Sequence, residues 1–152
     1  METLQYASKE AVIEAAIGFL EEAGRSYGET LSSPHKTREF LRLRIGAEER
    51  EVFTVIYLNN QHQIIAVEDL FHGTLDGAAV YPREVAKLAL QHNAAAVIFG
   101  HNHPSGTTEP SAADRRITER LCSGLGLLDI RVLDHLIVSE KSSYSFAEQG
   151  LL

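Results

Sequence analysis

The junction between an apolar run, AAAVIFG, and a polar stretch, HNHPSGTTEPSAAD, constrains the fold more than any other part of the chain. Residues 94–100 carry no charge and end in glycine, which is typical of a short strand buried inside a sheet. The polar stretch then lies at the carboxyl end of that strand, where α/β proteins commonly place their ligand sites. We therefore expect a central sheet with its functional groups at this edge.

The sequence on either side of this junction predicts alternating helices and strands. Proline opens two of the helices, and the NNQH link between the first two strands favours a hairpin. We expect helices over residues 8–23, from Pro34, over 82–92 and over 112–124, a linker over 24–34, strands over 51–59, 63–70, 94–100 and 129–139, and a strand end within YSFAEQG. This order indicates an α/β fold in which helices flank a mixed β-sheet.

Composition is that of an ordinary globular domain. The 152 residues are 44% hydrophobic and 23% charged, and a chain of this length is expected to form one domain. Cys122 is the only cysteine, so an intramolecular disulfide and a cysteine zinc cluster are both excluded. The chain shows neither a secretory signal nor an apolar run of about 20 residues. We therefore expect a cytoplasmic protein without membrane association.

The formal net charge of −7 disfavours direct nucleic-acid binding, because such binding depends on Lys and Arg neutralising phosphates. The most basic segment, HKTREFLRLR at residues 35–44, is better interpreted as a solvated helix face. The tripeptide His-Asn-His does not indicate an HNH nuclease, whose named residues are scattered through a metal finger.

The polar stretch contains residues with the chemistry and spacing of a metal site. His101 and His103 are two apart, so in extended backbone both rings point to one side. Ser111 is suited to cap the next helix, and Asp114 then falls in its first turn. Two imidazoles and a carboxylate are a typical set of catalytic zinc ligands, with the fourth position left for water. The alternative is a polar loop followed by a capping box. The residues by themselves leave both interpretations open.

A hydrolytic zinc site also needs a general base. Two carboxylates near strand ends, Glu51 and Glu68, have a suitable residue type. Glu51 has the better case, since it directly precedes the apolar run VFTVIYL. Either residue could instead be a solvated carboxylate at a strand end, and the sequence does not choose between them.

The spacing His101-x-His103-Pro104, six residues, Ser111-x-x-Asp114 resembles the JAMM (MPN-plus, JAB) metalloprotease motif. The surrounding segments EREVFTVIYLNNQHQII, GTLDGAAVYPREVAKLAL, AAAVIFGHNHPSG, DIRVLDHLIVS and YSFAEQGLL are similar to RadC-like proteins. This resemblance covers residues 31–152 as a RadC-like JAB/MPN domain and leaves residues 1–30 as an N-terminal helix and linker. It implies a three-layer, cytidine-deaminase-like arrangement.

The resemblance also implies roles for individual residues. His101, His103 and Asp114 match zinc ligands of the family, Ser111 matches a serine that stabilises the oxyanion, and Glu51 matches the general acid/base. His135, in the sequence LDHL, is a candidate for supporting a ligand from behind. An ordinary histidine satisfied within its strand is the slightly favoured alternative.

The implied function is that of a zinc-dependent metallopeptidase or isopeptidase-like hydrolase with an unknown peptide or protein substrate. RadC proteins with an additional N-terminal helical region are read as DNA-binding, and we expect this chain to be a short form without that region. The alternative function is a non-catalytic or DNA-repair-associated RadC-family binding module. The complete set of three zinc-ligand residues argues against this alternative. A nucleotide deaminase is excluded because its zinc site requires a P-C-x-x-C signature.

Overall fold

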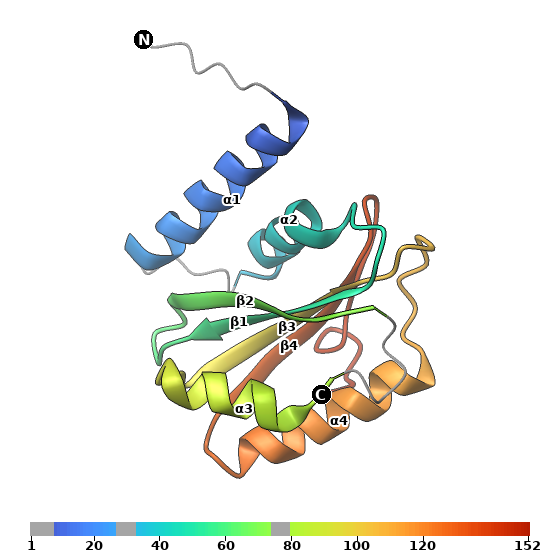
Figure 1. Ribbon diagram of the computed structural model, residues 1–152. Helices are drawn as coiled ribbons and strands as arrows, with labels where there is room; N and C mark the ends of the chain where they lie inside the picture. The colour runs from blue at the N-terminus through green and yellow to red at the C-terminus, as the bar shows by residue number, and fades with distance from the viewer. Residues whose placement is uncertain (1–7, 27–32, 74–79) are drawn as a thin grey trace.

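The computed structural model describes residues 8–26, 33–73 and 80–152. Within these residues there are four helices and five strands. The strands form a single mixed sheet, and the helices cover both of its faces (Figure 1). The elements are α1 (Lys9–Ser26), α2 (Pro34–Ile45), β1 (Val52–Leu58), β2 (Ile64–His72), α3 (Pro82–Gln91), β3 (Ala96–Asn102), α4 (Ala112–Gly126), β4 (Arg131–Val138) and β5 (Ser143–Ser145). The predicted α/β class and the flanked mixed sheet are confirmed.

The strands lie in the order β2-β1-β3-β4-β5. β1 and β2 form the expected antiparallel hairpin, and β3 pairs antiparallel with β1 and parallel with β4. Every residue of β3 is buried, as expected for the central strand. The chain therefore places the end of β3 between two neighbouring strands and under a helical layer on each side.

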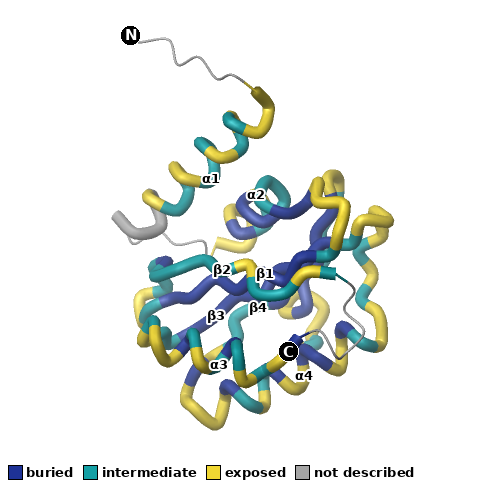
Figure 2. The backbone as a smooth tube through the Cα atoms, in the orientation of Figure 1, coloured by how far each residue is buried: buried dark blue, intermediate teal, exposed yellow. Residues whose placement is uncertain are grey.

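Alternation of side chains along the strands divides the core into two layers. Ile98 of β3 packs with Phe40 and Leu41 of α2 on one face of the sheet, while Phe99 packs with Leu121 of α4 on the other. Helices α1 and α2 cover the first face, and α3 and α4 cover the second (Figure 1). Figure 2 shows the buried strands β1 and β3 between helices whose outer sides are exposed.

Most predicted boundaries are close to those observed, and prolines 34 and 82 open α2 and α3 as expected. One boundary near the site is wrong, because β3 continues through Asn102 instead of ending at Gly100. His101 pairs with Phe53 of β1 and with Ile137 of β4, so pairing on both sides extends the strand.

Helix α1 continues to Ser26, past its predicted end at residue 23 and into the linker expected over residues 24–34. Positions 27–32 of that expected linker lie outside the described residues. In the part of the chain that the structure describes, no helix combines the length and apolarity needed to cross a membrane.

Candidate metal centre

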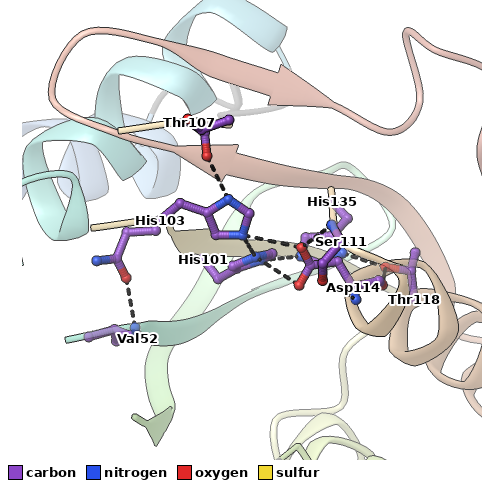
Figure 3. Close-up of polar contacts among 9 residues, drawn as sticks. Val52, His101, His103, Thr107, Ser111, Asp114, Thr118 and His135 are labelled. Carbon is purple, nitrogen blue, oxygen red and sulfur yellow. Dashed lines mark hydrogen bonds and ion pairs between the residues drawn. The ribbon is translucent and has the colours of Figure 1, made fainter. Parts of the chain in front are cut away.

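Three side chains with metal-binding atoms converge at the carboxyl end of β3. His101 lies inside the strand, His103 follows its end, and Asp114 lies in the first turn of α4. Figure 3 shows the two imidazoles and the carboxylate pointing toward one another. Their ligand atoms all lie within 4.8 Å of one another. The spacing of two residues does place both rings on one side, as the sequence predicts.

The separations between these atoms fit a small tetrahedral ion. The Nε2 atoms of His101 and His103 are 3.0 Å apart, and each lies 3.2 Å from an oxygen of Asp114. A zinc ion with bonds of about 2.0–2.1 Å requires ligand atoms roughly 3.3 Å apart. Two imidazoles with one carboxylate suit zinc and neighbouring transition metals better than calcium or magnesium, which favour oxygen ligands. The three residues could therefore hold a transition-metal ion.

The N-terminus of α4 fixes the carboxylate. Ser111 caps this helix: its Oγ accepts from the backbone N–H of Asp114 over 3.0 Å, and its own N–H donates to Asp114 Oδ2 over 2.8 Å. Burial raises the pKa of the Asp114 carboxyl, but its close contacts with both histidines and the hydrogen bond from the backbone N–H of Ser111 outweigh burial and hold the pKa well below its usual range. The capping box thus contains one of the possible metal ligands, and the two interpretations of the sequence are compatible.

His103 is held by a carbonyl oxygen of its own loop. Its Nδ1 donates to the backbone oxygen of Thr107 over 2.7 Å, which leaves Nε2 directed at His101 and Asp114 (Figure 3). Metal-binding histidines usually donate their second ring N–H in this way. The hydrogen bond to Asp114 raises the pKa of His103, so the site attracts a proton, and a metal cation would compete for the same position.

His101 is completely buried and is held from behind by His135. Its Nδ1 lies 2.7 Å from His135 Nε2, and His135 Nδ1 lies 2.6 Å from Thr118 Oγ1. Burial lowers the pKa of both rings. Both interpretations of His135 therefore hold: its ring nitrogens are satisfied within the fold, and one of their partners is a possible metal ligand.

The residue between the two histidines connects the site to the segment before β1. Asn102 faces away from the rings, accepts from the N–H of Val52 over 2.7 Å and donates to the carbonyls of Glu48 and Arg50. Sequence reasoning missed this role. The available signal was its position within His-Asn-His, since strand alternation turns the middle side chain to the opposite face.

Of the two candidate bases, Glu51 lies near the histidines. Burial lowers the pKa of His101, whereas the negative charges of Asp114 and Glu51 act in the opposite direction. Glu68 lies instead on β2 against His92, with 3.4 Å between its Oε1 and His92 Nε2. The fold thus brings Glu51 to the same edge as the possible ligands and leaves Glu68 elsewhere.

A cleft of about 360 Å³ opens beside His103. The segment between α2 and β1, the loop after β3 and the turn between β4 and β5 form its walls. Its lining includes Glu48, Glu49, Pro104, Glu140 and Lys141. His101 is buried while His103 is partly exposed, and of the three possible ligands the cleft borders only His103.

Comparison with known proteins identifies the family. Residues 31–151 match the family described as the RadC-like JAB domain. The chain belongs to the RadC-like JAB domain family. The resemblance inferred from the sequence is therefore confirmed.

Individual RadC-family relatives support this assignment. The chain is 56% identical to a UPF0758 protein of Cellvibrio japonicus over 98% of its own length and 66% of the relative's. It is 50% identical to a UPF0758 protein of Aeromonas hydrophila, covering 97% of the chain and 66% of the relative. A UPF0758 protein of Vibrio cholerae is 55% identical over 97% of the chain and 92% of the relative. The chain thus spans about two thirds of the length of the first two relatives.

Proposed function

We propose that this RadC-like JAB protein is a zinc-dependent hydrolase of the JAMM type that cleaves a peptide or isopeptide bond. One observation carries the proposal: two imidazole nitrogens and a carboxylate converge with separations of 3.0–3.2 Å. Lone-pair atoms placed so closely repel one another unless a cation or a proton lies between them. His101, His103 and Asp114 would hold the zinc ion. When bound there, zinc lowers the pKa of water to about 7 and polarises a carbonyl group.

Glu51 is proposed as the group that moves the proton. The carboxylate removes a proton from the attacking water as the water oxygen bonds to the substrate carbonyl carbon. It then delivers this proton to the nitrogen of the leaving amine as the carbon–nitrogen bond breaks. Its electrostatic influence on both histidines supports this position.

Ser111 is proposed to stabilise the negative charge that develops on the substrate oxygen. Its Oγ acts as an acceptor in the helix cap, so the cap does not use its hydroxyl hydrogen. That hydrogen can be donated to the oxyanion of the tetrahedral intermediate. Ser111 is exposed, which leaves room for a substrate at this position.

Metal content of the purified protein tests the proposal. We expect about one zinc ion per chain, measured by elemental mass spectrometry after dialysis against zinc and then buffer. His103→Ala should lose the zinc because it removes a ligand. His35→Ala is the matched control, since His35 is exposed on α2 and outside the ligand cluster. A wild-type protein without bound zinc would contradict the proposal, as would equal zinc content in His103→Ala.

A further inference from the structure

A line of hydrogen bonds runs from α4 through β4 to the buried histidine of the metal centre. Thr118 Oγ1 lies 2.7 Å from the backbone oxygen of Asp114 and 2.6 Å from His135 Nδ1. His135 Nε2 lies 2.7 Å from His101 Nδ1. Thr118, His135 and His101 are all buried, so each polar atom in this line depends on its protein partner.

The direction of donation is set at the Thr118 end. A carbonyl oxygen can only accept, and an oxygen–oxygen distance of 2.7 Å requires a hydrogen between the two atoms. The hydroxyl of Thr118 has one hydrogen, which is therefore directed at the carbonyl of Asp114. The Thr118 oxygen must then accept from His135, and the hydrogen of the second contact belongs to His135 Nδ1.

The same logic continues along the line. His135 packs against the rings of Phe53, Phe99 and Phe146, an apolar environment that favours the neutral imidazole. A neutral imidazole that carries its hydrogen on Nδ1 has a lone pair on Nε2. His135 Nε2 therefore accepts from His101 Nδ1, and in the neutral form of the buried His101 ring the Nε2 atom keeps its lone pair facing His103 and Asp114.

We propose that Thr118 and His135 are positioning residues that fix His101 in the tautomer whose Nε2 lone pair is available to a cation. His103 is fixed directly by the carbonyl of Thr107, whereas the buried His101 is fixed through a second histidine. The line also ends on the backbone of Asp114, so it ties two of the three possible ligands to one helical turn of α4. The consequence for metal binding rests on the proposed zinc site, but the tautomer assignment does not.

Long-range proton–nitrogen correlation spectra of the zinc-free protein with isotope-labelled histidine test the tautomers. The expected result is a hydrogen on Nδ1, and none on Nε2, for both His101 and His135. A hydrogen on Nε2 of either ring would overturn the proposal. This measurement uses the wild-type chain and requires neither bound zinc nor turnover. A protein that cleaves no peptide would therefore count against the hydrolase proposal and leave the tautomer result intact.

Substitution of Thr118 tests the consequence for metal affinity. Thr118→Val keeps the side-chain shape but removes the acceptor for His135, and zinc affinity should fall roughly 10–100-fold. Thr118→Ser keeps the hydroxyl and should restore affinity to near the wild-type value. Affinity is measured by competition with a chromophoric chelator, with circular dichroism to check that each variant is folded. Equal zinc affinity in wild type and folded Thr118→Val would overturn the positioning role.

Discussion

The side-chain oxygen of Asn102 accepts a hydrogen bond of 2.7 Å from the backbone N–H of Val52. The amide nitrogen of Asn102 donates to the carbonyls of Glu48 and Arg50, at 3.2 Å and 2.9 Å. One buried side chain thus satisfies three backbone groups of the segment that leads into β1. Because this segment carries Glu51, Asn102 joins the proposed base to the strand that carries the first histidine.

Asn102→Ala should lower the free energy of unfolding by about 1–3 kcal/mol, because buried backbone groups lose their partners. Chemical denaturation of the zinc-free protein measures the change. Asn59→Ala is a matched control: Asn59 also makes three side-chain hydrogen bonds, but it lies in the partly exposed turn between β1 and β2, where water can replace them. If Asn102→Ala lowers the free energy of unfolding no more than Asn59→Ala does, this role of Asn102 is contradicted.

Glu51→Gln should keep zinc and lose turnover by a factor of about 100 or more, since the amide cannot take up the proton. Zinc content and hydrolysis of peptide and isopeptide substrates are measured on the same samples. Glu68→Gln is the control and should retain activity, because Glu68 contacts His92 at a distance from the ligands. Wild-type turnover in Glu51→Gln would show that Glu51 is not the general base. Loss of activity in Glu68→Gln would point to Glu68 as the general base instead.

Gly100→Ala should destabilise the fold by about 1–3 kcal/mol. A Cβ at this position of β3 would lie 2.6 Å and 2.7 Å from the two methyl carbons of Leu41 on α2, so the helix must shift or Leu41 must change rotamer. Gly124→Ala on α4 meets nothing within 4 Å and should instead stabilise the helix by about 0.5–1 kcal/mol. Thermal unfolding measures both, and changes of the same sign would contradict this account.

We expect the partly buried carboxyl of Asp134 to make the free energy of unfolding depend on pH. Burial raises the pKa of its carboxyl in the folded protein, although Ser145 and the N–H groups of Ala147 and His135 donate to it. The folded state then holds the proton more tightly than the unfolded state. This contribution to stability is present below the unfolded pKa of about 3.9 and is lost as pH rises through the folded value.

Asp134→Asn should remove this dependence, because the amide has no proton to lose in this range. Its Oδ1 can accept from both N–H groups, and its Nδ2 can donate to Ser145. The measurement is the difference in unfolding free energy between wild type and variant across the acid range. The free energy of unfolding of Asp134→Asn should increase relative to that of wild type as pH rises. A constant difference would show that the pKa of Asp134 is the same in the folded and unfolded states.

The part of the site that sequence reasoning found is local. The two histidines are two residues apart on extended backbone, and Ser111 and Asp114 are three apart at a helix start. Strand alternation and helix capping fix such relations within one segment, so they can be read without knowing the rest of the fold. The one local error, ending the strand at Gly100, arose because pairing with β1 and β4 extends it.

Other relations depend on segments that are distant in the chain. His135 reaches His101 through the parallel pairing of β3 with β4, and Asn102 reaches Val52 beside the antiparallel pairing of β3 with β1. The register of two strands decides which side chains meet, and a shift of one residue would turn each of them to the opposite face. The roles of Glu51 and Ser111 in catalysis stay predictions.

The sequence by itself determined the α/β class, the family and a set of possible metal ligands, because each depends on local periodicity or on a short motif. The tertiary structure decided that Glu51 and not Glu68 lies near these ligands, and that His135 and Thr118 stand behind His101. The physical reason is that hydrogen bonds and charge interactions act over a few ångströms in space. Separation along the chain does not tell which residues come this close in space, because that depends on how the strands pair and the helices pack.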